Sequence, residues 1–305
     1  MELEPHSKSS HLAIQETIQK INEIIAKTEE NCLKKMGLDE LQKTITIIDG
    51  SLLGYKEKAK DNLDKLRTAN RGVLHKYGNC EKQVFELSVS IRGTLDTTIP
   101  NLKSLDLGVE NKETYWTLTA EALTDGLNSL KTASNNLNGL DGGTLRGHFR
   151  QMLQNLDQDR AIRVQRSTEN NMNVEGPTEK KKKTEIKEES KELTDYGNRI
   201  WNYLSSYYPQ GVTQEELGHF MALYESLKKN LEKAIEITDQ FIKELEEYKV
   251  IFKEIVQLNS SKKKMAKLLV ENRDLRDDLI PSLEKLRVTC LSYITLQKAS
   301  HSKLL

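Results

Sequence analysis

The feature that most constrains the fold is a periodic apolar stripe at residues 212–258. Its side chains recur at alternating steps of three and four residues, the spacing that keeps one face of a helix against a partner helix. The residues between them are mostly lysine and glutamate. We therefore predict one amphipathic helix, roughly 70 Å long if unbroken. Its apolar side, here called the interaction seam, consists of Leu217, Phe220, Tyr224, Leu227, Leu231, Phe241, Leu245, Tyr248, Phe252 and Ile255.

The N-terminal half carries the same period. One helix is expected at residues 9–37, where isoleucines recur at steps of three and four. Residues 38–98 predict either one long helix or two helices broken near Gly72, because a glycine weakens a helix interior. Pro100 is expected to end this segment, since proline lacks the N–H group that a helix interior requires.

Turns and prolines divide the remaining helical segments. A helix with Trp116 and Leu137 on its apolar side leads into residues 139–147, whose several glycines predict a turn. The last helix is expected to restart at Pro281, because proline is favoured in the first turn of a helix.

The apolar period is lost at residues 158–190, where polar and charged residues predominate. A segment with so few apolar residues does not bury a core, so we expect a disordered, charged central linker. This linker separates an N-terminal helical segment, residues 1–157, from a C-terminal long-helix segment, residues 191–305. It contains a candidate basic signal for nuclear import or an anionic surface, formed by Lys180, Lys181, Lys182 and Lys183.

Composition argues against several classes of function. The formal net charge is zero, from 46 basic and 46 acidic residues, whereas binding to nucleic acid favours a basic excess. The three cysteines and six histidines show no metal-ligand spacing, and no set of nucleophile, base and orienting group can be assembled. We therefore expect no enzymatic activity, no small-molecule substrate, no cofactor, no metal and no nucleic acid partner.

These features together predict an all-α protein, an elongated antiparallel helical bundle or coiled coil with long helices. The least demanding arrangement packs the helix at residues 212–258 against residues 38–98, because the two segments are of comparable length. The leading hypothesis is a non-enzymatic structural or scaffold protein that binds other helical proteins, or itself, through its seams. Whether the seams close within one chain stays open at this point.

The alternative hypothesis is a soluble helical bundle that acts on membranes in the manner of pore-forming proteins. Such proteins usually carry a distinct apolar hairpin, and the nearest candidate is the short stretch at residues 45–55, which contains Asp49. No apolar run approaches the roughly 20 residues that span a bilayer. The polar N-terminus carries no secretory signal and the cysteines suit free thiols, so we expect an intracellular, cytoplasmic protein, with the nucleus as alternative.

Overall fold

Every element of the described chain is a helix. The computed structural model describes residues 5–53, 58–104, 108–172, 214–257 and 273–302. The helices are α1 (Pro5–Lys34), the short 3-10 helix η1 (Lys35–Gly37), α2 (Leu38–Ser51), α3 (Lys58–Asp61), α4 (Leu63–Lys103), α5 (Val109–Asn138), α6 (Gly142–Met172), α8 (Gln214–Gln257) and α10 (Arg273–Ser302). The predicted all-α bundle of long helices is confirmed.

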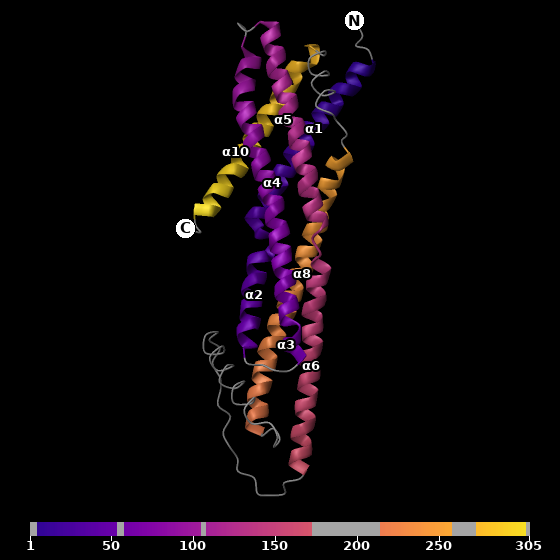
Figure 1. Ribbon diagram of the computed structural model, residues 1–305, viewed down its shortest axis with the longest axis vertical. Coiled ribbons are helices and arrows are strands. Elements are labelled where there is room, and N and C mark those ends of the chain that lie inside the picture. The colour runs from indigo at the N-terminus through magenta and orange to yellow at the C-terminus, as the bar shows by residue number, and fades with distance from the viewer. Residues whose placement is uncertain (1–4, 54–57, 105–107, 173–213, 258–272, 303–305) are drawn as a thin grey trace. The chain divides into compact units, whose positions relative to one another are not determined.

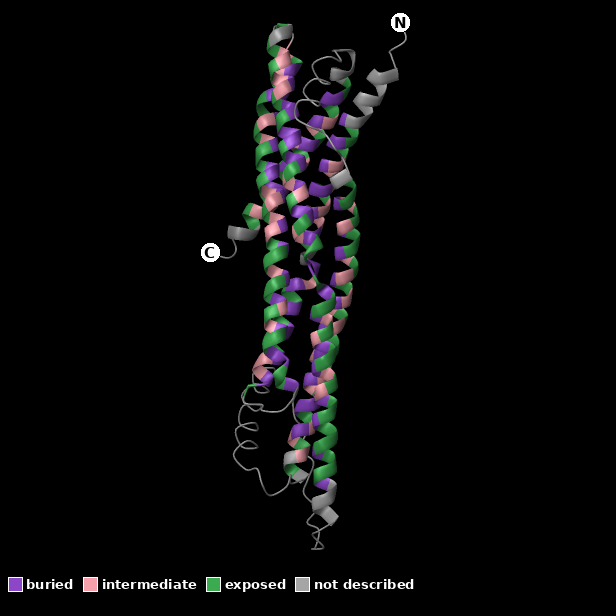
Figure 2. Cartoon of the chain, turned by 45° about the vertical axis from the view of Figure 1, so that its right-hand side comes forward, coloured by how far each residue is buried: buried purple, intermediate pink, exposed green. Residues whose placement is uncertain are grey.

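In the long helices buried residues are interspersed among exposed ones at helical spacing (Figure 2), and the buried face is mainly apolar except in the second half of α6. The largest fully buried side chains are aromatic and include Tyr224, Tyr248, Tyr293, Phe149 and Phe220. Removal of such side chains from water is the main favourable contribution to folding. The period of three and four residues therefore places the core where the sequence predicts it.

The helices form two compact units. Unit 1 comprises Met1–Met36, Leu74–Leu140 and Lys243–Leu305, and unit 2 comprises Gly37–Val73 and Asp141–Ile242. One boundary between the units falls inside α4 and one inside α8, while the others lie inside η1 and between α5 and α6. The units thus interleave along the sequence, unlike the consecutive segments expected above, because helices pack on partners that are distant along the chain.

In unit 1, α1 packs against α5 and α10 (Figure 1). α4 lies antiparallel to α10, since ion pairs join Lys103 to Glu284 at 2.7 Å and Asp96 to Arg287 at 3.6 Å. α4 and α8 run in the same direction, opposite to α1, α5 and α10 (Figure 1). Unit 1 therefore contains both parallel neighbours, such as α1 with α10, and antiparallel neighbours, such as α4 with α10.

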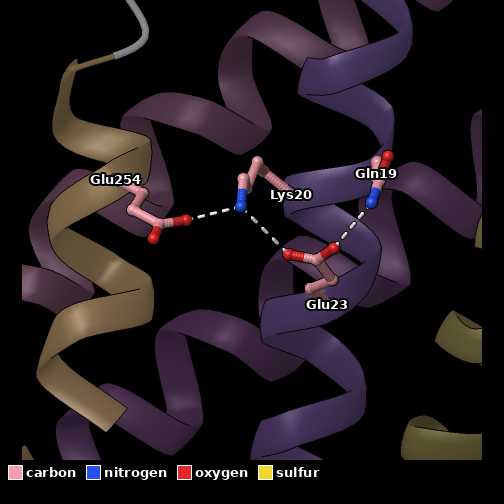
Figure 3. A network of polar contacts seen from close by, with 4 residues as sticks. All are labelled: Gln19, Lys20, Glu23 and Glu254. Carbon is pink, nitrogen blue, oxygen red and sulfur yellow. Dashed lines mark hydrogen bonds and ion pairs between the residues drawn. The ribbon is translucent and has the colours of Figure 1, made fainter. Parts of the chain in front are cut away.

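Polar contacts also tie α1 to α8 in unit 1 (Figure 3). The Lys20 ammonium group of α1 lies 2.5 Å from Glu254 of α8 and 3.3 Å from Glu23 of its own helix. Gln19 donates a hydrogen bond to the other oxygen of Glu23 at 2.8 Å. The hydrogen bond to Glu254 raises the pKa of Lys20, but these side chains are partly solvated, so the pair adds little stability.

In unit 2 the chain reverses direction between α2 and α4. Asp49 pairs with Arg67, and the Asn70 amide donates to Gln42 at 2.6 Å, so the two helices are antiparallel. The break in residues 38–98 therefore lies between Ser51 and Leu63, and its expected position near Gly72 is wrong. Gly72 lies inside α4, where a glycine costs only about 1 kcal/mol relative to alanine.

Because the chain reverses between α2 and α4, α8 is antiparallel to α2 but runs in the same direction as α4. In unit 2, α8 is antiparallel to α2: Lys233 pairs with Glu40 at 2.7 Å, and Ile237 lies against Gly37. The expected antiparallel packing of residues 212–258 on residues 38–98 is thus correct for α2. It is wrong for α4, which runs in the same direction as α8 in unit 1 (Figure 1).

Two prolines do not mark helix ends as expected. α4 continues through Pro100 to Lys103, and α10 begins at Arg273 and continues through Pro281. Both prolines are exposed, while the adjoining Ile99 and Ile280 are buried. Burial of these neighbours offsets the hydrogen bond that each proline loses.

α6 extends through regions that the sequence assigned to a turn and a linker. It begins at Gly142, where the Asp141 carboxylate accepts a hydrogen bond from the Thr144 N–H at 2.9 Å, as at a helix N-cap. It ends at Met172, so residues 158–172 are helical and the expected linker start is wrong. The rest of that linker, with its four-lysine basic signal, lies outside the described residues.

Candidate functional site

The interaction seam is largely buried within the chain itself. Leu217 is half-buried, and the side chain of Ile255 lies outside the described residues. The buried members are Phe220, Tyr224, Leu227, Leu231, Phe241, Leu245, Tyr248 and Phe252. These side chains pack against other helices of the same chain, so they form a core. Their role in binding a partner stays a prediction.

In unit 2 the seam meets basic side chains of α6. The guanidinium group of Arg163 lies 4.5 Å from the centre of the Phe220 ring, and that of Arg160 lies 4.9 Å from the Tyr224 ring. The Tyr224 hydroxyl donates to Asp157 at 2.5 Å. Such cation–π contacts contribute about 0.5–2 kcal/mol each. They explain how a polar stretch, taken above for a linker, remains helical and attached to α8.

In unit 1 polar side chains from four helices meet in what we call the tyrosine–cysteine cluster. The Cys32 thiol donates to Glu81 at 2.9 Å, and the Gln297 amide donates to both Cys32 and Tyr293 at 3.2 Å. The Tyr293 hydroxyl donates to the backbone carbonyl of Glu81 at 3.1 Å. The full set is Thr28, Cys32, Tyr77, Cys80, Glu81, Tyr248, Tyr293 and Gln297.

Burial keeps the thiols of unit 1 neutral. It raises the pKa of Cys80 and of Cys290 to about 12. It also raises the pKa of Cys32, and the nearby carboxylate of Glu81 adds to the effect. Because the thiolate is the reactive form, these cysteines are poor nucleophiles and poor metal ligands at neutral pH. The cluster therefore has the properties of a packed polar layer.

The described residues bring together no group of three or more His, Cys, Asp or Glu side chains that could hold a metal ion. In the same part of the chain, no helix combines the length and the apolar character that crossing a bilayer would require. The described part of the stretch at residues 45–55, which ends at residue 53, does not form one apolar surface: Ile48 and Leu52 are buried, whereas Ile47 and Leu53 are exposed.

Comparison with known protein families places part of the chain beside a described family. Residues 8–142 match the family haemolysin E (HlyE). The matched segment includes most of α1 and all of α2 to α5, and it covers less than half of the chain. No curated protein is significantly similar to the chain. The part of the chain that is similar to haemolysin E therefore contributes helices to both compact units.

The sequence alone did not reveal the tyrosine–cysteine cluster. Its members come from helices that are distant along the chain, and their spacing forms no motif. One signal was present: a polar residue, Thr28, occupies a seam position of α1 between Ile25 and Cys32. A polar residue at a core position indicates a hydrogen-bonding partner across the bundle, here Tyr248.

Proposed function

We propose that this chain is a membrane-acting helical protein that forms pores. The observation that carries the proposal is the match of residues 8–142 to haemolysin E. The all-α bundle of long amphipathic helices supports the same class of protein, and so does a core that closes within the chain. This function was the alternative hypothesis from the sequence. The scaffold hypothesis has no comparable support, because the described seam residues are mostly buried by their own chain.

Amphipathic helices restrict how such a protein would cross a bilayer. A helix with charged residues along one face is costly in hydrocarbon unless that face lines water or packs on protein. Several such helices, supplied by several copies of the chain, would satisfy this requirement by surrounding a water-filled channel. The proposal therefore includes assembly of more than one copy in the membrane.

Hydroxyl groups in the core reduce the cost of separating the helices. Thr28, Ser88 and Thr238 are buried, yet each donates to a carbonyl one turn earlier in its own helix at 2.7 Å. These hydrogen bonds persist when a helix leaves its neighbours. Contacts that join helices, such as that of Thr28 with Tyr248, would be lost on rearrangement, but the bonds within each helix would not.

The proposal is tested by release of a self-quenching dye from liposomes. We expect the purified chain to release the dye, with a dependence on protein concentration steeper than first order, because several copies must assemble. Absence of release at every lipid composition tried would contradict a pore-forming function.

A disulfide between α4 and α10 tests whether the bundle must rearrange. The Ser88 side chain lies within hydrogen-bonding reach of Cys290, and both are buried in unit 1. Ser88→Cys therefore places two thiols side by side at little steric cost. We expect the oxidised variant to release less dye than wild type, and reduction to restore release. Ser88→Cys combined with Cys290→Ala is the control, because it lacks the second thiol. Equal release by the oxidised variant and the control would show that α4 and α10 stay together.

A further inference from the structure

A pocket of about 420 Å³ lies in unit 1 beside the tyrosine–cysteine cluster. It is formed where α4 meets the last turns of α10, and its volume falls within the range of sites for small ligands, about 300–1,000 Å³. Its lining residues are Gly78, Glu81, Lys82, Phe85, Gln297 and Lys298. Nothing in the proposed pore-forming function requires this pocket.

Gly78 keeps the pocket open. A Cβ atom built at this position has no heavy atom within 4 Å, so the glycine is not needed for close packing of helices. A glycine inside a helix is destabilising by about 0.5–1 kcal/mol relative to alanine. The space beside α4 is therefore a volume that a ligand or a larger side chain could fill without displacing the helix.

The wall of the pocket is mainly apolar, while its charges lie at the surface. Phe85 is half-buried and presents a ring, and Lys82 and Lys298 are exposed residues of the lining. Lysine side chains of this kind cover apolar surface with their methylene stems and keep the ammonium group in water. The pocket thus combines an apolar wall with cationic groups at its mouth.

The two half-buried polar side chains of the lining, Glu81 and Gln297, are engaged with the protein. The Glu81 carboxylate accepts from Cys32, and the Gln297 amide donates to Cys32 and Tyr293. Lys82 contacts Glu86 at 3.8 Å in an exposed pair, which is a weak interaction. The ammonium groups are therefore the polar groups best placed to contact a ligand.

We propose that this pocket binds a single-chain amphipathic carboxylate of the fatty-acid type. The alkyl chain lies along Phe85 and the lysine stems, and the carboxylate lies at the mouth between Lys82 and Lys298. The negative charge of Glu81 repels the carboxylate of the ligand and so favours its placement beside the two exposed lysines. Because the site joins α4 to α10, the bound ligand stabilises their packing.

The first test fills the pocket. Dodecanoate, below the concentration at which it forms micelles, is titrated into the full-length chain by calorimetry, and the melting temperature is recorded in parallel. Gly78→Leu is expected to abolish binding and the rise in melting temperature. Gly93→Leu is the matched control, since Gly93 lies in the same helix and unit and also has no heavy atom near its Cβ position. Binding to Gly78→Leu as tight as to Gly93→Leu would overturn the proposal.

The second test changes the charges. Lys82→Ala combined with Lys298→Ala is expected to weaken dodecanoate binding about fivefold to tenfold, in line with two solvated ion pairs. Dodecanol is expected to bind equally to wild type and to this variant. Dodecyltrimethylammonium, which has the same chain and the opposite charge, is expected to bind wild type more weakly than dodecanoate does. Equal binding of the two ions to wild type would contradict a carboxylate ligand. These outcomes do not depend on whether the chain releases dye from liposomes.

Discussion

Tyrosine hydroxyl groups in the core of unit 1 differ in their hydrogen bonding. The Tyr248 hydroxyl contacts Thr28 and lies beside the Cys80 thiol, and its side chain is completely buried. The Tyr77 hydroxyl is also buried, and among the described residues it has no hydrogen-bond partner. A buried hydroxyl without a partner has lost its interaction with water and gained nothing in exchange.

This difference predicts opposite results for two matched substitutions. Tyr248→Phe should reduce the free energy of unfolding by about 1 kcal/mol, because it removes a hydrogen-bonded hydroxyl group. Tyr77→Phe should leave stability unchanged or increase it by about 1 kcal/mol, because it removes an unpaired one. Urea denaturation measures both, and equal losses in the two variants would contradict this view of the cluster.

The buried thiols predict a loss of stability in alkali. The ordinary thiol pKa of 9.0 applies to the unfolded chain, whereas burial raises that of Cys80 and Cys290 to about 12. Between these values the unfolded chain binds fewer protons than the folded chain, so stability falls as pH rises. The loss should be on the order of 1 kcal/mol per thiol for each pH unit in this range.

Denaturation by urea at about pH 8, 9 and 10 would measure this loss. The double variant Cys80→Ala with Cys290→Ala should show a weaker pH dependence than wild type, whatever its stability at neutral pH. Buried Tyr248 and Tyr77, whose pKa values burial also raises, contribute mainly at the upper end of the range. An unchanged dependence in the double variant would show that other groups cause the loss.

At the scale of the element, two of the three glycines of α6 have contrasting surroundings. A Cβ atom at Gly142 would lie 2.6 Å from Cγ1 of Ile242 in α8, so this glycine permits close approach of the two helices. A Cβ atom at Gly147 has no heavy atom within 4 Å. The close approach fixes how the start of α6 packs in unit 2.

Substitution of alanine for each of these glycines should therefore change the stability of the protein in opposite directions. Gly142→Ala is expected to destabilise by about 1–3 kcal/mol, because it overpacks the contact between α6 and α8. Gly147→Ala is expected to stabilise by up to about 1 kcal/mol through helix propensity alone. Thermal denaturation followed by circular dichroism distinguishes them. Stabilisation by Gly142→Ala would show that the helices are not in close contact there.

The apolar period predicted where the helices are. The expected helix ends, based on proline and on polar composition, were wrong in several places. A long apolar stripe at steps of three and four residues identifies a helix even where single residues do not fit the pattern. Pro100 and Pro281 remain within helices because their buried neighbours hold the backbone in place, which the prolines themselves do not reveal. Residues 158–172 read as linker because their core contacts are polar: Asp159 accepts from the Ala59 N–H at 3.2 Å, and Arg163 stacks on Phe220.

At the scale of the molecule, similarity to haemolysin E and the amphipathic helices support one proposed activity. Because the proposed pore is made of helices already present, binding to liposomes should preserve the helical content of the chain. Far-UV circular dichroism with and without liposomes measures this content, and a large loss of helical signal would contradict a channel built from these helices.

The most direct test of the pore-forming proposal is the current across a planar lipid bilayer after addition of the purified chain. A channel formed by a defined number of copies predicts discrete, uniform steps of conductance that persist after unbound protein is washed away. An undisturbed bilayer, or irregular current without uniform steps, would contradict the proposal.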